Sequence, residues 1–494
     1  MFSYPSILKM GLSGLAIIFL MTSCQEEPEL PCAEQTWYRD LDQDGLGNPA
    51  DSQVACEQPM GYVDNADDDS DLCVEMIDEC GICGGDGAPT WYADLDGDSL
   101  GDANNSQTAC TQPTGYVANA DDADDQRNDH LSAIERTFAD RIDLENLLNY
   151  ANQAVPNYIN RDNTRNNPIT DAGATLGRVL FYDKNLSVSN TISCASCHQQ
   201  AFAFSDQSLA SQGVDGTTGR HSMRLVNARF AQEVRFFWDE RANTLEMQTT
   251  QPIQDHIEMG FSGQNGDPSI NDLMVKLEAI DYYQELFTFV YGDAQITEAR
   301  MQQALAQFVR SIQSFDSRFD QGLAQVNNPG NNFPNFSAQE NQGKMLFLAP
   351  PGGANGGAGC AGCHRVPEFD IDPNSRNNGV VGNLNDPSVL DVTITRSPSL
   401  RDLVNNQGQL NGPLMHDGSL TTLLAVIDHY DDVEVIPGNT NLDPRLRGGP
   451  GPGGGQGQEL NLSDAEKAAL VAFLGTLTGD QVYSDERWSD PFRN

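Results

Sequence analysis

Apolar side chains recur at helical spacing in several stretches of the second half of the chain. Residues 130–153, 271–292 and 297–323 each place hydrophobic residues three or four positions apart, so one face of each predicted helix belongs to a core. A closing helix is expected from Ser463, because Glu466 follows at the spacing of a capping box. Strand patterns are scarce after residue 130. The pattern therefore predicts a mainly α fold.

Stretches rich in Asn, Pro and Gly divide this helical region. Residues 327–335 hold a run of Asn and Pro that is typical of a linker, and glycine-rich loops interrupt the unit that follows. We expect two helical domains and a short tail, with these bounds: 130–326, 327–480 and 481–494.

The region before residue 130 contains an internal repeat. Residues 37–69 recur from Trp91 onwards, 54 positions later, and each copy has aspartate at alternate positions before a Leu-Gly pair. Alternating carboxylates in a turn present hard oxygen ligands to one point, as Ca²⁺ requires. The candidate ligands are Asp40, Asp42, Asp44, Asp94, Asp96 and Asp98. The copies resemble the short aspartate-rich metal-binding modules of secreted bacterial proteins. The alternative is a solvated acidic stalk.

Acidity is concentrated in this repeat region. The chain has a net charge of −43, and residues 25–130 hold 27 Asp and Glu against 2 Lys and Arg. Such a surface repels nucleic acid and anionic membrane, so neither is an expected partner. The helical region is only mildly acidic.

The N-terminus has the features of an export signal. Lys9 precedes a short apolar stretch that ends at Met-Thr-Ser-Cys, with Cys24 last. This ending resembles a bacterial lipobox, which implies that residues 1–23 are a signal peptide and that Cys24 carries a lipid anchor in the outer membrane, facing periplasm or cell surface. An ordinary secretory signal is the alternative. No second apolar run is long enough to span a bilayer.

Six further cysteines lie in the acidic region, 24–129. An even number in an exported segment predicts three disulfides, and fifteen pairings are open. The six are Cys32, Cys56, Cys73, Cys80, Cys83 and Cys110. The fold prediction is therefore a disulfide-rich, loop-rich acidic region followed by the helical domains.

Two Cys-x-x-Cys-His runs carry the chemistry of the helical region. One is Cys194 to His198 and the other is Cys360 to His364. This spacing is the attachment signature of c-type haem: the thiols of Cys194 and Cys197, or of Cys360 and Cys363, bind the vinyl groups, and the histidine binds the iron. A zinc site or a redox dithiol is the competing interpretation.

The sequences around these runs resemble the bacterial di-haem cytochrome c peroxidases and their relatives of the MauG type. The similar segments are 176–204, 236–259 and 398–430. The resemblance covers about residues 130–478 and implies two cytochrome-c-like α domains. It makes the first haem, at His198, peroxidatic and the second, at His364, an electron-transfer haem.

The same resemblance assigns three further residues. Glu258 matches the family's distal glutamate, Gln248 its distal glutamine, and Trp238 the tryptophan between the haems. A proton-shuttling carboxyl beside the iron is what cleavage of peroxide requires. Each could instead be an ordinary polar surface or core residue.

Several positions depart from the family pattern. Many members have a histidine in a loop that caps the peroxidatic iron, whereas residues 204–219 contain none. We therefore expect an iron that is open at rest. His221 stands where the family has a calcium-binding asparagine. Pro413 fits the calcium site, but Asn411 stands where the family usually has threonine. Both changes weaken the prediction of a calcium ion between the haems.

The sixth ligand of the second haem also differs. Tyr430 occupies the position of the methionine ligand of many members, and MauG-type relatives have tyrosine there. His429 and Met415 are alternatives, as is the absence of a protein ligand. A phenolate ligand would lower the reduction potential.

The leading prediction is an oxidoreductase of the cytochrome-c peroxidase type. It would reduce hydrogen peroxide to water with electrons from a small redox protein, a cytochrome or a copper protein. The runner-up is a MauG-like di-haem oxidase that acts on a protein or organic partner. A non-catalytic di-haem electron carrier is the third hypothesis, and a homodimer is left open.

Overall fold

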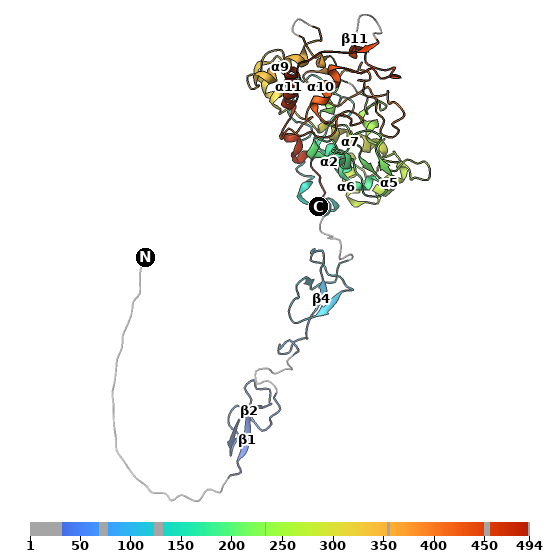
Figure 1. Ribbon diagram of the computed structural model, residues 1–494. Helices are drawn as coiled ribbons and strands as arrows, with labels where there is room; N and C mark the ends of the chain where they lie inside the picture. Colours follow the sequence, from blue (N-terminus) through green and yellow to red (C-terminus); the bar gives the residue numbers. More distant parts are fainter. Residues whose placement is uncertain are drawn as a thin grey trace, which may run out of the picture. The chain divides into compact units, whose positions relative to one another are not determined.

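A computed structural model describes residues 32–68, 78–122, 132–232, 234–352, 356–448 and 455–492 (Figure 1). The chain separates into one unit up to residue 129 and a second from residue 130. The predicted signal peptide 1–23, Cys24 and Cys73 lie outside the described residues.

The first unit contains the same small antiparallel sheet in each copy of the repeat. The first sheet has the order β2-β1-β3, from β1 (Gln35–Arg39), β2 (Asn48–Ala55) and β3 (Tyr62–Val63). The second has the order β5-β4-β6, from β4 (Thr90–Ala93), β5 (Ser106–Thr108) and β6 (Tyr116–Val117). The indole of Trp37 donates to the Ala55 carbonyl at 3.2 Å, and Trp91 donates likewise to Ala109 at 2.9 Å. Equivalent residues therefore make equivalent contacts.

Disulfides hold the repeat region together. Cys32 pairs with Cys56 and Cys80 pairs with Cys110, and Cys83 is also disulfide-bonded. The sheets bury few apolar side chains: of their strand residues, only Ala93 is fully buried. Covalent links therefore supply order that a hydrophobic core supplies elsewhere.

The second unit is built from short helices joined by long loops. Its α-helices are α1 (Ala133–Phe138), α2 (Asp171–Tyr182), α3 (Cys194–Cys197), α4 (Leu245–Thr249), α5 (Ile270–Glu278), α6 (Asp281–Tyr291), α7 (Glu298–Ser311), α8 (Arg318–Val326), α9 (Ala338–Leu348), α10 (Leu423–Asp431) and α11 (Asp464–Leu474). Its 3-10 helices are η1 (Ala139–Arg141), η2 (Lys184–Leu186), η3 (Gln200–Phe202), η4 (Ala228–Phe230), η5 (Cys360–Gly362), η6 (Pro444–Leu446), η7 (Gly475–Leu477), η8 (Gln481–Tyr483) and η9 (Glu486–Trp488). Its described residues also form three pairs of short antiparallel strands: β7 (Gln212–Gly213) with β8 (Gly216–Thr217), β9 (His364–Arg365) with β10 (Asp370–Ile371), and β11 (Arg447–Gly448) with β12 (Gln456–Gly457).

Two large hydrophobic cores lie in this unit. The first is formed around α2 and α7, where Phe181 and Phe308 pack with ring centroids 5.1 Å apart. The second is formed around α9 and α11, and Phe473 contacts Phe347 there at 5.3 Å. Each core supports one of the two Cys-x-x-Cys-His segments.

The cores do not follow the expected domain bounds at every point. Helix α8 lies within the predicted first domain, yet its Phe319 and Leu323 are buried in the second core. Val482 and Trp488, in the predicted tail, are buried in the first core. The end of the chain is thus part of the packed structure.

The helix expected over residues 130–153 is wrong beyond Arg141. Asp143 Oδ1 accepts the backbone N–H of Glu145 at 2.8 Å and that of Asn146 at 3.1 Å, and Asn149 Oδ1 accepts that of Asn152 at 2.9 Å. Short polar side chains that bond to nearby backbone compete with helical hydrogen bonds. The apolar residues of this stretch are buried by turns instead of by one helical face.

Each of the other two long predicted helices is two shorter helices in the structure. The stretch 271–292 breaks between α5 and α6, and 297–323 breaks between α7 and α8. In the second break, the backbone N–H of Ser314 donates to Asn227 Oδ1 at 2.9 Å, so tertiary contacts replace helical hydrogen bonds. The capping box of Ser463 and Glu466 is confirmed at the start of α11. No helix among the described residues is long and apolar enough to cross a membrane.

Helices α9 and α11 cross where Gly343 faces Ala469, and this contact gives a stability prediction. A Cβ on Gly343 would overlap the carbonyl oxygen of Ala469. We expect Gly343→Ala to lower the free energy of unfolding by about 1–3 kcal/mol, because overpacking a tight core forces backbone shifts. Gly475→Ala is the matched control, since no heavy atom lies within 4 Å of a Cβ there. Urea unfolding followed by circular dichroism checks the pair, and equal effects of the two substitutions would contradict it.

Candidate active site

A cavity of about 390 Å³ lies beside the first Cys-x-x-Cys-His segment. Its lining includes Cys194, Cys197 and His198 on one side, and neither cysteine is in a disulfide. Ser193 caps α3 with a capping box that includes Ser196, which fixes the turn carrying both thiols. The volume falls within the range of about 300–1,000 Å³ typical of cofactor sites.

One ring nitrogen of His198 is held by the backbone of the loop that follows it. Its Nδ1 lies 3.2 Å from the carbonyl oxygen of Phe204, and Ala203 and Phe204 have φ values of 54° and 60° that turn the chain back to make this contact. Burial lowers the pKa of His198, so the ring is neutral. A neutral imidazole that donates from Nδ1 keeps the Nε2 lone pair for a metal.

Gln248 and Glu258 line the same cavity from other elements. Gln248 is on α4, which Thr244 caps by accepting the backbone N–H of Met247 at 3.1 Å. Glu258 lies in a turn fixed by Asp255, whose Oδ1 accepts the backbone N–H of Ile257 at 2.9 Å and that of Glu258 at 3.0 Å. The structure therefore brings together the predicted thiols, histidine, glutamine and glutamate.

The environment of Glu258 makes its carboxyl hard to ionise. Burial, and then the charge of Asp255, raise its pKa to about 7, while Arg241 acts in the opposite direction. A carboxyl with a pKa near neutrality can accept and release a proton under physiological conditions. Sequence patterns gave no sign of Asp255 or Arg241.

The segment from Phe204 to Gly219 forms a hairpin pinned to the turn of Glu258. Val214 N–H donates to the Glu258 carbonyl at 3.1 Å, and Asp215 N–H donates to the Ile257 carbonyl at 3.2 Å. A Cβ on Gly213 would overlap the Ile257 carbonyl oxygen, so the close approach requires glycine. From this segment only Gly213, Thr218 and Gly219 line the cavity, and none of them has an imidazole.

A second cavity, of about 610 Å³, lies beside the other Cys-x-x-Cys-His segment. Cys360 and Cys363 are not in disulfides, and burial lowers the pKa of His364 to about 4. The remaining lining is mostly apolar, including Phe347, Leu348, Leu400, Leu403, Leu414, Leu423, Ile427, Leu470 and Leu474. Free thiols, a neutral histidine and an apolar wall fit a c-type haem in both cavities.

Tyr430 and His429 take different orientations at the second cavity. Tyr430 and Met415 both line it, and Asn378 Nδ2 lies 3.2 Å from the Tyr430 hydroxyl and 3.3 Å from the Met415 sulfur. His429 is not in the lining, and its Nε2 lies 2.9 Å from the Asn378 carbonyl. Asn378 thus organises all three candidate ligands, although its sequence context carried no signal.

Trp238 lines both cavities and is fixed by His221. Its Nε1 donates to the His221 carbonyl at 2.8 Å, and His221 N–H donates to the His416 carbonyl at 2.7 Å. The His221 ring is buried, with Nδ1 3.0 Å from the Ser208 carbonyl, and burial lowers its pKa to about 4. His221 is therefore a neutral member of the wall between the cavities. Asn411 is also buried, and its side chain donates to the Asp402 carbonyl at 2.9 Å.

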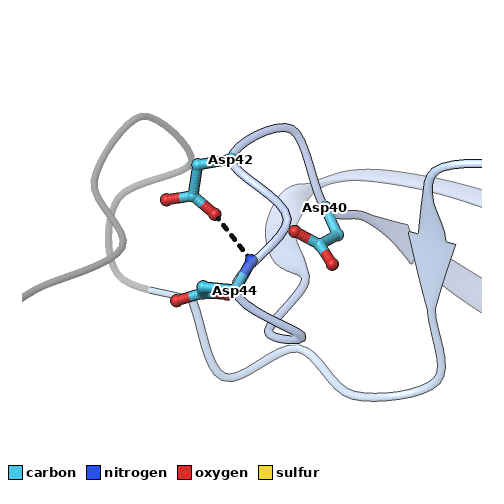
Figure 2. A group of neighbouring side chains, drawn as sticks. All are labelled: Asp40, Asp42 and Asp44. Carbon is cyan, nitrogen blue, oxygen red and sulfur yellow. Dashed lines mark hydrogen bonds between the residues drawn. The ribbon is translucent and has the colours of Figure 1, made fainter.

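The aspartates of each repeat gather in a turn of the first unit. In each copy, one carboxylate oxygen from each of three residues lies within 4.8 Å of the others. Figure 2 shows Asp40, Asp42 and Asp44, with Asp42 accepting the Asp44 N–H at 3.3 Å. Oxygens Asp40 Oδ1, Asp42 Oδ2 and Asp96 Oδ2 are buried without a hydrogen-bond partner among the described residues. Burial, and further the charges of Asp98, Asp122 and Asp94, raise the pKa of Asp96.

Comparison with known proteins gives one consistent result. The family model for di-haem cytochrome c peroxidase matches residues 171–328. The methylamine utilization protein MauG of Methylophilus methylotrophus is 31% identical over 63% of this chain and 84% of its own length. The cytochrome c551 peroxidase of Nitrosomonas europaea is 28% identical over 62% of this chain and 80% of its own.

A solved structure agrees with these sequence relatives. The crystal structure of a MauG-like protein associated with microbial copper homeostasis matches with a TM-score of 0.54 and 28% identity, covering 69% of this chain and 99% of that one. Two cavities that each hold a Cys-x-x-Cys-His segment, together with these matches, show that the chain belongs to the family of di-haem cytochrome c peroxidases and MauG.

Proposed function

We propose that this protein is a di-haem peroxidase that reduces hydrogen peroxide to water with electrons from a small redox protein. The observation that carries the proposal is the first cavity, where Glu258 and Gln248 share one space with His198. Relatives named as cytochrome c peroxidases and as MauG support peroxide chemistry on two haems.

The cysteine thiols in each cavity assign one haem to it. Cys194 and Cys197 would hold the first haem with His198 as axial ligand, and Cys360 and Cys363 the second with His364. Iron in the first cavity would bind peroxide and supply electrons to its O–O bond. The hairpin between Phe204 and Gly219 offers no histidine to block that site.

Glu258 is the proton carrier in this proposal. Its carboxylate accepts the proton of the peroxide oxygen nearer the iron and returns it to the departing oxygen, which leaves as water. Gln248 donates a hydrogen bond that orients the peroxide. Two electrons and two protons in total convert one peroxide to two waters. Trp238, which lines both cavities, lies on the route by which electrons from the second cavity arrive.

Tyr430 is our choice for the sixth ligand of the second haem. Its hydroxyl and the Met415 sulfur share the donor Asn378, whereas His429 is engaged with the Asn378 backbone. Burial raises the pKa of Tyr430, so a metal is needed to stabilise its phenolate.

The MauG-like alternative uses the same first cavity but a different reductant. A tyrosine ligand and a site without a capping histidine favour oxidation of a protein or organic partner. Rapid steady-state turnover of reduced cytochrome c with peroxide is expected from the peroxidase. Slow turnover with fast peroxide consumption would favour the alternative. If the diferric protein does not react with peroxide, only the hypothesis of a non-catalytic electron carrier remains.

Replacing Glu258 tests the proton step. We expect Glu258→Gln to slow the reaction with peroxide about 100-fold or more, because general acid–base groups contribute roughly 10²–10⁴-fold. Stopped-flow mixing of the diferric protein with peroxide measures the rate. Glu278→Gln, an exposed glutamate at the end of α5, is the control. An unchanged rate in the first variant would remove Glu258 from the mechanism.

The pH profile tests the same residue independently. A carboxyl with a pKa of about 7 is protonated below that pH and cannot accept a proton. The bimolecular rate should therefore rise as the pH increases through about 7, and Glu258→Gln should lose this dependence. A profile that is the same in both proteins would contradict the assignment.

Replacing Tyr430 tests the ligand of the second haem. We expect Tyr430→Phe to change the electron paramagnetic resonance signal of that haem and to raise its reduction potential, because a phenolate stabilises the ferric state. Met415→Leu is the matched control from the same wall and should leave the signal as it is. The reverse outcome would make Met415 the ligand.

We further propose that the acidic repeats bind Ca²⁺ and that the chain is exported and held to the outer membrane by a lipid on Cys24. Clustered carboxylates with unpartnered oxygens support the first proposal, and disulfides in the same unit support export. The anchored unit would then hold the peroxidase outside the cytoplasm, as a monomer or a homodimer.

Calcium titration of the full chain tests the repeats. We expect calorimetry to detect two sites, and Asp96→Asn to abolish one, because the substitution removes a negative charge from a three-carboxylate cluster. Asp86→Asn, at an exposed position outside both clusters, is the control. Chelation should lower the unfolding temperature of the repeats without altering the haem spectrum. An absence of calcium binding would support an acidic stalk.

A further inference from the structure

The two cavities of the second unit share a stretch of wall. The residues that line both of them are His221, Ser222, Met223, Arg224, Trp238, Arg396 and Pro398. Two of these seven side chains, Arg224 and Arg396, are cationic, although the second cavity is otherwise mostly apolar. Two guanidinium groups thus lie in the wall that the cavities share.

Arg224 is buried with few partners. It is 8% exposed, and its Nη2 donates to the Ser399 carbonyl across 3.4 Å, at the long limit of a hydrogen bond. Its Nε has no hydrogen-bond partner among the described residues. A guanidinium has five N–H donors, so most of the capacity of Arg224 is unused within the protein.

No carboxylate of the described residues forms an ion pair with Arg224. Asp402 supplies the main opposing charge, but its Oδ1 accepts the Gly479 N–H at 2.8 Å and the Tyr483 hydroxyl at 3.3 Å. Burial lowers the pKa of Arg224 to about 10 and raises that of Asp402 to about 6. A buried cation without a bonded anion is unfavourable, so an anion is expected beside it.

Arg396 differs from Arg224 although it lines the same wall. Its Nη1 donates to the Arg235 carbonyl at 2.8 Å, and its guanidinium packs over the Phe236 ring at 4.9 Å. Arg396 is therefore already engaged by the protein. Arg224 is the cation with free donors.

We infer that Arg224 binds the propionate carboxylates of both haems across the shared wall. Haem is apolar except for its iron and two propionates, and a guanidinium is the side chain best suited to carboxylates. Because Arg224 lines both cavities, one side chain reaches a carboxylate from each. Its fixed charge favours the reduced state of both irons and so raises both reduction potentials.

The test uses the full chain with both haems covalently attached. In Arg224→Met we expect both reduction potentials to fall in a spectroelectrochemical titration, and the propionate bending bands of both haems to shift in resonance Raman spectra. Arg178→Met is the matched control. Arg178 is 1% exposed and bonds to Ser489 at 2.6 and 3.0 Å, but it lines neither cavity. This control should lower stability and leave potentials and bands unchanged.

Two further variants keep the test decisive if Arg224→Met does not accumulate with both haems. Arg224→Lys retains the charge and should stay near the wild-type potentials, whereas Arg224→Gln retains a donor and should show the fall. Unchanged potentials and bands in the uncharged variant, or changes at one haem alone, would overturn the inference. Both readouts are taken without peroxide or donor, so they are independent of the proposed peroxidase activity.

Discussion

The backbone of His221 holds together the wall on which both cavities depend. Its N–H donates to the His416 carbonyl and its carbonyl accepts the Trp238 indole N–H, at 2.7 and 2.8 Å. The first of these bonds joins two segments that are far apart in the chain. The neutral, buried His221 ring adds its contact to the Ser208 carbonyl. These contacts fix Trp238 where it lines both cavities, and the His221 ring in the same wall carries no charge.

The two cavities are chemically unequal despite their identical attachment signature. The first is lined by Glu258, whose pKa is raised to about 7, and by the neutral His198. The second is lined largely by leucine side chains, and Tyr430 and Met415 there both contact the Asn378 side chain. In the proposed peroxidase, proton transfer would take place in the cavity that holds Glu258, and the other cavity would serve electron transfer. The difference between the cavities arises from the residues around each Cys-x-x-Cys-His segment and not from the segment itself.

Sequence predicted the features that depend on local spacing. The Cys-x-x-Cys-His segments, the capping box at Ser463 and the repeated aspartate turns each lie within a few residues. Long helices were overestimated because Asp143 and Asn149 bond to their own neighbouring backbone, and because Asn227 replaces the helical partner of Ser314. Arg224 and Asn378 could not be found from sequence. Their roles depend on which cavities they line, and that is decided by tertiary packing.

Glu258 shows why such a site must be supported by the rest of the fold. Its pKa in the folded chain is raised from 4.5 to about 7, mainly by burial. This residue does not penalise folding below about pH 4.5. The penalty grows as the pH rises from about 4.5 to about 7, because the carboxyl ionises in the unfolded chain first, and it is complete above 7, where the buried carboxylate is formed. The proposed proton transfer requires that same ionised form. The proposed function and stability thus oppose each other at neutral pH. The Asp255 side chain accepts hydrogen bonds from this turn, and the backbone N–H groups of Val214 and Asp215 donate to it, so these bonds hold the carboxyl in the cavity against that penalty.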